Sequence, residues 1–324
     1  MKNIVIIGGG TGTFTLLSGL RKFPSNNSVI VSTADNGGSG GKLRYELGVI
    51  PPGDYRQCLL GLAYTDDVVK DLFSYRFAEG SLQGHTVGNI IIAALEKITG
   101  NIENSIEIAG RLLNIRGSVL PVSLKPTELS AILENGKKLF GEHSIDDQKP
   151  IGKASPIASL KLSSAKANPK ALVALKNADV IIFGPGDLFT SILPNILVPG
   201  IKEAINKSSA KKILVTNIMT KFGQTDHFKA SDFVKVLQQY LKGKIDVALV
   251  NNKKPAAPQL KRYAAQKAVL VEADMNNIKE QGVEVVAQDL LSDSIPSAAK
   301  GDKLQRSFLR HDPEKVAKLI WSLL

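Results

Sequence analysis

The chain of 324 residues contains one cysteine, Cys58, and only 6% aromatic residues. A single cysteine excludes an internal disulfide and a cysteine-based metal cluster, and it is typical of a reducing compartment. With no stripe of interleaved aromatic and basic residues, the sequence disfavours nucleic-acid binding in spite of a net charge of +11. Lysine doublets such as Lys137-Lys138 indicate a solvated surface, and their charge also favours anionic ligands.

Long apolar runs are missing as well, and none approaches the roughly 18 residues of a membrane span. The first eight residues are too short and too soon glycine-rich for a signal peptide. His143, His227 and His311 have no metal-ligand spacing. Hydrophobic residues make up 43% of the chain and predict a sizeable core. We therefore expect a cytoplasmic protein without a membrane span.

Short apolar runs alternate with helical patterns along most of the chain. This alternation predicts a doubly wound α/β fold with a mainly parallel sheet. The expected strands are 2–7, 29–33, 180–183, 212–216 and 246–250. The expected helices are 14–22, 54–64, 87–98, 105–113, 231–241 and 313–324, the last with Asp312 as N-cap. We expect one domain, residues 1–324.

Residues 117–164 have a different pattern of apolar and polar residues from the rest of the chain. Their apolar segments are short and are separated by prolines and by the turn signal Asn135-Gly136. This pattern predicts a small antiparallel β insert within the α/β domain.

Two glycine-rich turns follow the first two expected strands. The first contains Gly9, Gly10, Thr11, Gly12 and Thr13 and opens a helix, where free N–H groups favour an anion. It lacks the lysine of a Walker P-loop, so NTP hydrolysis is not implied. A tight turn that binds nothing is the alternative interpretation.

The second turn, residues 34–41, contains Asp35, Asn36, Gly37, Gly38 and Ser39. An acidic residue about 20 positions after the first glycines is typical of a ribose contact in nicotinamide enzymes. A dinucleotide fold needs no second glycine-rich cradle at this place, however. Ligands of open α/β sheets bind outside the carboxyl ends of the strands, so both turns predict one crevice for a phosphate-bearing ligand.

Further polar residues follow later strands or open later helices. Asp54 is either the N-cap of its helix or, with Arg56, reaches the crevice. His85 and Asn89 open a helix, and the sequence pattern pairs no serine or cysteine nucleophile with His85. The remaining candidates are Gly184 and Gly186, at a second helix N-terminus, and Asn217, at a strand end.

These motifs together resemble the YvcK/CofD-like family. The matching stretches are residues 7–13, 34–44, 51–56, 84–89, 184–191, 217–220, 249–252 and 310–312. They span nearly the whole chain in order.

The resemblance implies a Rossmann-like core and one of two roles. The YvcK branch, known as gluconeogenesis factors, consists of cytoplasmic regulators that bind UDP-N-acetylglucosamine and link carbon use to cell shape and peptidoglycan synthesis. The CofD branch is 2-phospho-L-lactate transferase. The Asp-Asn-Gly-Gly start at Asp35 and the Pro-Pro-Gly-Asp segment that ends at Asp54 resemble the YvcK branch.

The resemblance also places nucleotide-sugar contacts on residues 10–13, on residues 35–39, and on Tyr263 and Arg310, which would otherwise be taken for surface residues. Three departures stand out. Gly40 and Asp187 each replace a more usual serine, and residues 221–224 replace Gln-Pro-Gly-Glu with a lysine-led segment. Asp187 would repel a phosphate unless a cation intervened.

We therefore expect a non-catalytic regulator that binds UDP-N-acetylglucosamine and signals to an unidentified protein partner. One alternative is a transferase, with Asp35, Asp54 or His85 assisting an attacking hydroxyl and Mg²⁺ as a cofactor. The other is a nicotinamide oxidoreductase. Whether the chain forms a homo-oligomer stays open.

Overall fold

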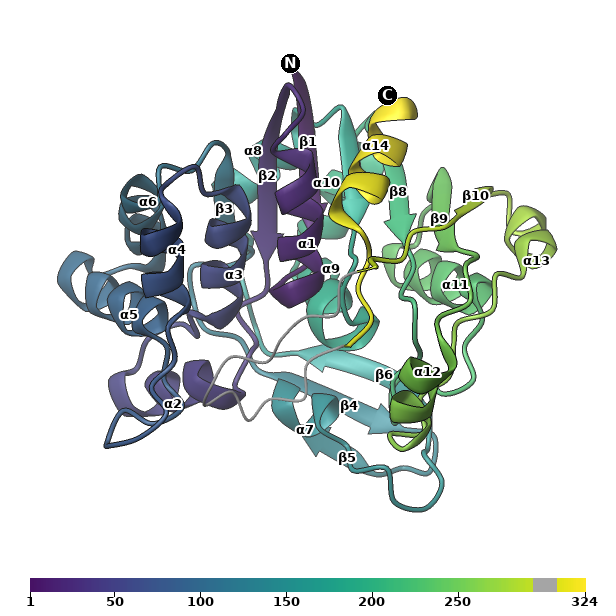
Figure 1. Ribbon diagram of the computed structural model, residues 1–324, viewed down its shortest axis with the longest axis horizontal. Coiled ribbons are helices and arrows are strands. Elements are labelled where there is room, and N and C mark those ends of the chain that lie inside the picture. Colours follow the sequence, from purple (N-terminus) through teal and green to yellow (C-terminus); the bar gives the residue numbers. More distant parts are fainter. Residues whose placement is uncertain (294–307) are drawn as a thin grey trace.

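The computed structural model describes residues 1–293 and 308–324. Its centre is a seven-stranded parallel sheet with helices on both faces (Figure 1). The strand order is β10-β9-β8-β7-β1-β2-β3. The strands are β1 (Lys2–Ile7), β2 (Ser25–Val31), β3 (Ser118–Pro121), β7 (Val180–Phe183), β8 (Lys211–Val215), β9 (Val247–Asn251) and β10 (Glu284–Gln288). The predicted doubly wound fold is confirmed.

Both faces of the sheet are buried, because successive side chains of a strand point to opposite sides. In β1, Ile4 and Ile6 join one apolar cluster, and Val5 and Ile7 join the other. The first cluster contains side chains from α1 (Gly10–Leu20), α3 (Gly53–Leu62), α4 (Asp67–Ser74), α5 (Val87–Thr99), α6 (Ile102–Leu112) and α14 (Pro313–Ser322). The second contains side chains from α8 (Pro169–Lys176), α9 (Leu193–Ile196), α10 (Ile201–Lys207), α11 (Ala230–Leu241) and α13 (Met275–Glu280).

A separate three-stranded antiparallel sheet has the order β5-β4-β6. It consists of β4 (Leu129–Leu133), β5 (Lys138–Phe140) and β6 (Ile157–Leu162), and α7 (Glu142–Asp146) follows β5. The predicted Asn135-Gly136 turn joins β4 to β5, with Gly136 at a φ of 82°. The insert is smaller than predicted, because β3 pairs in parallel with β2 and belongs to the main sheet.

The second glycine-rich stretch is only partly a loop. Helix α2 (Gly38–Leu47) begins inside it, after Gly37. Two further elements, the π-helix η1 (Leu188–Ile192) and helix α12 (Ala257–Ala264), follow β7 and β9. At the other end of the chain, the Asp312 side chain accepts hydrogen bonds from the N–H groups of Glu314 and Lys315, which confirms the predicted N-cap of α14.

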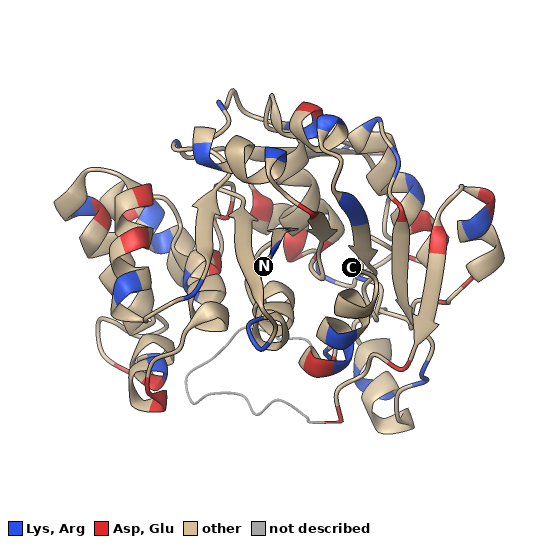
Figure 2. Cartoon of the chain, turned by 90° about the horizontal axis from the view of Figure 1, so that it is seen from above, with Lys and Arg blue, Asp and Glu red and all other residues tan. Residues whose placement is uncertain are grey.

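No single helix of the described residues is long and apolar enough to cross a membrane. One pair of segments, Leu188–Ile196 and Ile201–Lys207, satisfies length and composition together, but the pair is bent by 79° and its apolar residues lie in the core. Along the helices at the periphery, Lys and Arg positions are interspersed with Asp and Glu positions (Figure 2).

Candidate functional site

The strand order reverses between β1 and β7, and two glycine turns meet at this point. The turn after β1 leads into α1, and Gly10 at its start has a φ of 66°, a conformation that favours glycine. A Cβ on Gly12 would lie 2.3 Å from the carbonyl oxygen of Pro185, in the turn after β7. The predicted turns at residues 8–13 and 184–187 are therefore in direct contact, at the switch point where ligands of such sheets bind.

The second predicted turn provides a neighbouring wall. Asp35 Oδ1 accepts a hydrogen bond from the Gly37 N–H at 2.8 Å, which folds the chain into the start of α2. The Asn36 carboxamide points toward the antiparallel unit, where its Oδ1 accepts from the His143 N–H at 2.8 Å. Helix α1 thus begins after the end of β1, and α2 begins after the end of the neighbouring strand β2. The N–H groups in the first turn of each helix have no partner within the helix.

Ser39, His85 and Asn89 form a buried polar network. Ser39 Oγ lies 3.1 Å from His85 Nδ1 and accepts from Asn89 Nδ2 at 3.1 Å. Arg56 Nε donates to Asn89 Oδ1 at 2.9 Å, and all four residues are buried. The sequence pattern paired no serine with His85, whereas the fold brings Ser39 to it from another element. The network fixes the first turn of α2 against α5.

Asp54 faces the glycine turn and is not an N-cap. Helix α3 begins at Gly53, Pro52 occupies the cap position, and Asp54 lies in the first turn. A Cβ on Gly9 would be 2.1 Å from Asp54 Oδ2. Burial raises the pKa of Asp54 to about 7, and the charges of Asp35, Asp146 and Asp187 add to this effect. Of the two interpretations of Asp54, the structure supports the one in which it reaches the crevice.

Four more carboxyl groups surround Asp54: Asp35, Glu142, Asp146 and Asp187. Burial raises the pKa of Asp35, in spite of the Gly37 N–H, and raises that of Glu142 well above its usual value. Helix α7 supplies Glu142 and Asp146, which the sequence analysis missed because nothing in the local sequence links that segment to the strand ends.

Lys221 is the cation of this cluster. Its Nζ donates to Asp187 Oδ2 at 2.7 Å and also to Asp146 Oδ1. Burial alone would lower the pKa of Lys221, but the two carboxylates raise it above its usual value. Asp146 Oδ1 also accepts from Thr190 Oγ1 and Gln224 Nε2. Lys221 and Asp187, two positions at which the sequence analysis expected departures from the resembled family, are thus paired with each other.

The pairing of Asp187 with Lys221 gives a testable coupling. Replacing Lys221 with Gln should lower the free energy of unfolding by about 2 kcal/mol, because it leaves two partly buried carboxylates without their cation. Replacing Asp187 with Ser should lower it by about 1 kcal/mol, because Lys221 keeps its contact with Asp146. The double variant should lose less than the sum, with a coupling of about 1–3 kcal/mol in urea unfolding. Additive losses would show that the two side chains act independently.

Tyr263 packs against residues that follow β8 and β10. It is buried in an apolar cluster with Met219, Leu291 and Leu309. Its hydroxyl accepts from the Leu309 N–H at 3.1 Å. Burial raises the pKa of Tyr263, and charges on both Arg310 and Asp187 also act on it. Tyr263 thus lies near both Arg310 and the β7 turn.

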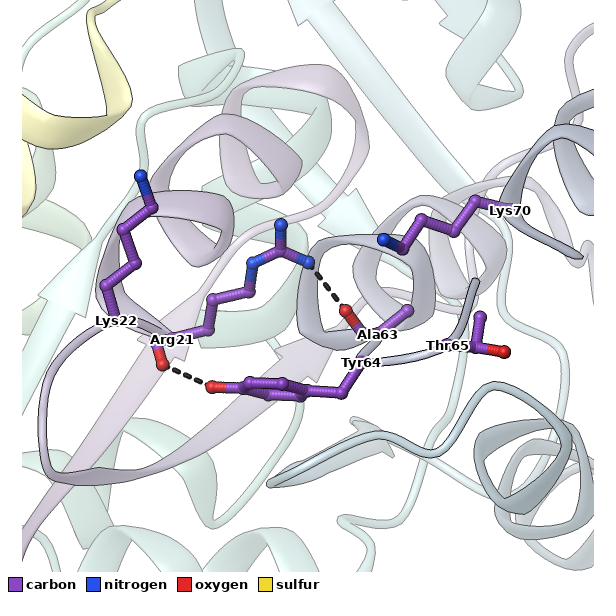
Figure 3. A pocket seen from close by; sticks show the side chains of 6 residues that line it. All are labelled: Arg21, Lys22, Ala63, Tyr64, Thr65 and Lys70. Carbon is purple, nitrogen blue, oxygen red and sulfur yellow. Dashed lines mark hydrogen bonds between the residues drawn. The ribbon is translucent and has the colours of Figure 1, made fainter. Parts of the chain in front are cut away.

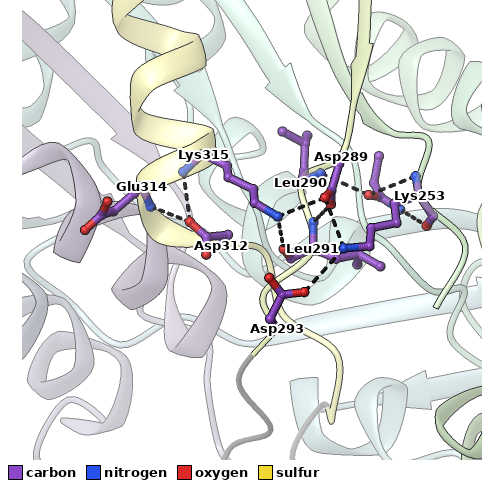
Figure 4. Close-up of polar contacts among 9 residues, drawn as sticks. Lys253, Asp289, Leu290, Leu291, Asp293, Asp312, Glu314 and Lys315 are labelled. Atoms are coloured by element: carbon purple, nitrogen blue, oxygen red, sulfur yellow. Dashed lines mark hydrogen bonds and ion pairs between the residues drawn. The ribbon is translucent and has the colours of Figure 1, made fainter. Parts of the chain in front are cut away.

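The segment with Arg310 is held by backbone contacts and lies beside the ionic contacts of Asp289 and Lys315 that Figure 4 shows. Ser292 N–H donates to the Arg310 carbonyl at 3.0 Å, and Asp312 N–H donates to the Leu290 carbonyl at 2.7 Å. Lys315 Nζ binds Asp289 Oδ2 at 2.9 Å and the Leu291 carbonyl. These contacts place residues 310–312 beside the end of β10.

The structure therefore gathers the predicted residues along one edge of the sheet. Asn217 follows β8 at the same edge, between the β7 turn and the Tyr263 side. Within the described ranges, no group of three His, Cys, Asp or Glu side chains is arranged to hold a metal ion.

Known proteins are similar to this chain over nearly its whole length. Residues 4–291 match the model of the family 2-phospho-L-lactate transferase CofD. A relative from Thermotoga maritima is 44% identical over 319 residues, which cover 98% of each chain. The gluconeogenesis factor of Bacillus subtilis is 38% identical, over 99% of this chain and 98% of its own.

A crystal structure from Bacillus halodurans, described as a member of the UPF0052 family, has a TM-score of 0.90 to this fold. It is 37% identical and covers 99% of this chain and 98% of that chain. The chain belongs to the CofD family, and it is similar over its full length to gluconeogenesis factors.

Proposed function

We propose that the chain is a cytoplasmic regulator that binds UDP-N-acetylglucosamine in the switch-point crevice without turning it over. The observation that carries this proposal is the contact of the α1 N-terminus with the turn at residues 184–186, next to the strand β2 that leads to α2. Glycines allow backbone N–H groups to approach a diphosphate closely, and helix N-termini favour its charge.

The regulatory part of the proposal rests on the relatives named gluconeogenesis factor. A protein that senses a nucleotide sugar can link gluconeogenic growth to peptidoglycan synthesis and cell shape, because such sugars are precursors of the cell wall. In this proposal the ligand-bound form acts on a protein partner, either as a monomer or as a homo-oligomer.

The carboxylates of the crevice would repel a diphosphate unless protons or a cation offset their charge. Asp146 and Asp187 are already paired with Lys221. Asp35 and Asp54 have raised pKa values, so a bound Mg²⁺ would relieve their crowding. Mg²⁺ commonly uses one or two carboxylates together with substrate phosphates. In this proposal, Mg²⁺ binds only together with the nucleotide sugar.

Titration calorimetry with UDP-N-acetylglucosamine, with and without Mg²⁺, tests the proposal. Arg310→Ala should weaken binding at least tenfold, since a charge-assisted hydrogen bond contributes about 1.5–3 kcal/mol. Arg111→Ala is the matched control, because Arg111 is exposed on α6. Absence of binding by the unaltered protein at millimolar ligand, or equal loss in both variants, would contradict the proposal.

One observation favours a transferase as a second candidate. A carboxyl group with a pKa of about 7 beside the glycine turn, Asp54, is suited to take a proton from an attacking hydroxyl. Chromatographic assay of nucleotide-linked substrates separates the two candidates. The regulator produces no turnover, whereas a transferase would show turnover that Asp54→Asn abolishes.

A further inference from the structure

A concave surface lies near the amino ends of the strands, opposite the glycine turns at the switch point. Helices α1 and α3 both begin at the crevice, where Gly9 contacts Asp54. Both run back toward the amino ends of the strands. Arg21 follows the end of α1 and Ala63 follows the end of α3. An α-helix rises 1.5 Å per residue, so eleven residues of α1 place Arg21 about 16 Å from the glycine turn.

The pocket at this edge has a volume of about 360 Å³, within the range of small-molecule sites. It is lined by Arg21, Lys22, Ala63, Tyr64, Thr65 and Lys70, so three of its six lining side chains are cationic (Figure 3). In this view, the charged end of Arg21 lies between those of Lys22 and Lys70 (Figure 3).

Tyr64 forms a rigid base for these cations. Its hydroxyl donates to the Arg21 carbonyl. The guanidinium of Arg21 lies 5.9 Å from the Tyr64 ring centroid, and that of Arg116 lies 4.4 Å from it. Arg21 Nη1 donates to the Ala63 carbonyl at 2.6 Å, which uses one of the five N–H donors of the guanidinium.

The carboxylates that pair with the cations of this pocket are exposed. Among residues 1–293 and 308–324, no carboxylate forms an ion pair with Arg21 or Arg116. Lys22 pairs with Glu314 at 2.6 Å and Lys70 with Asp67 at 3.0 Å, but both carboxylates are more than half exposed. Exposed pairs of this kind contribute little, so both lysines can turn toward an incoming anion.

We propose that this pocket binds a phosphate-bearing small molecule, a diphosphate or a phosphate ester. Arg21 supplies planar N–H donors to the phosphate oxygens, and Lys22 and Lys70 supply mobile positive charges. The site is separate from the nucleotide-sugar crevice and binds its ligand independently of it.

Titration of pyrophosphate into protein saturated with UDP-N-acetylglucosamine tests the proposal. The test variant is Lys22→Gln/Lys70→Gln. The control is Lys137→Gln/Lys138→Gln, which removes the same charge from two exposed positions. Lys137 lies between β4 and β5, and Lys138 is the first residue of β5. Because glutamine is polar and uncharged and all four lysines reach the surface, we expect unchanged thermal midpoints. Lys70→Gln alone replaces the double variant if that one unfolds.

The unaltered protein and the control should bind one pyrophosphate, and the pocket variant should bind it at least tenfold more weakly. Equal affinity in all three proteins would show a general effect of net charge and would overturn the proposal. Absence of pyrophosphate binding by the unaltered protein would also overturn it. The pocket variant keeps the crevice intact, so its UDP-N-acetylglucosamine titration reports on the proposed function separately.

Discussion

Replacing Asp54 with Asn should stabilise the protein above pH 7. The pKa of Asp54 rises from 3.8 to about 7 in the folded protein, so the folded state binds more protons than the unfolded state between these pH values. Stability therefore falls as the pH rises through this window. The ionised carboxylate costs at most about 4 kcal/mol above pH 7, and the Asn variant should recover about half or more of it.

Urea unfolding at pH 4 and pH 8 measures this effect. The two proteins should differ little at pH 4, where Asp54 is protonated, and most at pH 8. Asp71→Asn is the control, because Asp71 is exposed on α4. Equal stability of the Asp54 variant and the unaltered protein at pH 8 would contradict the proposed burial of this carboxyl group. A carboxylate that lowers stability and faces a glycine turn predicted to bind a ligand is typical of a functional group.

Gly12→Ala should both destabilise the protein and weaken nucleotide-sugar binding. The new Cβ would lie 2.3 Å from the Pro185 carbonyl oxygen, so the turns after β1 and β7 must separate. Such overpacking typically costs about 1–3 kcal/mol. Displacing the α1 N-terminus from its partner turn should lower the affinity for UDP-N-acetylglucosamine at least tenfold, which corresponds to about 1.4 kcal/mol.

Gly40→Ala is the matched control for Gly12→Ala. It also lies in the first turn of a helix at the crevice, but its Cβ would meet Asp35 Oδ2 and Pro51 Cβ at 3.4 Å, close to ordinary contact. Calorimetry and thermal unfolding of both variants should show a large loss for Gly12 and a small one for Gly40. Similar affinities in both variants would argue against a diphosphate-binding site between the turns after β1 and β7.

The sequence alone predicted the buried central strands of the parallel sheet. The buried strands β1, β7, β8 and β9 are almost entirely apolar, as strands buried on both faces must be, and they were predicted within one residue at each end. The edge strand β10 was missed, because Glu284 and Gln288 bracket only three apolar residues and none of the five is fully buried.

Helix α2 was missed for a different reason. Three of its first four residues are glycines, which have low helix propensity, and its stability depends on tertiary contacts. Ser39 hydrogen-bonds to Asn89, and a Cβ on Gly41 would lie 1.9 Å from the Asn36 carbonyl oxygen. The glycines permit this close approach, which no local pattern indicates.

The candidate site was predictable only where its residues lie in the strand-end turns. Glycine turns at residues 8–13 and 184–187 are visible in the sequence, and the topology rule places them together. Glu142 and Asp146 lie on α7, which follows the antiparallel strand β5. Their approach to Asp35 depends on how α7 packs against the strand ends. Lys221 was visible as a departure from the family pattern, but its pairing with Asp187 required the fold.

A crystal structure of the protein with UDP-N-acetylglucosamine and Mg²⁺ tests the central claim most directly. The diphosphate should lie at the N-terminus of α1, between the glycine turn that contains Gly9 to Thr13 and the turn at Gly184 to Gly186, with Arg310 in contact with the ligand. A ligand bound elsewhere on the chain, or an empty crevice at saturating concentration, would contradict it.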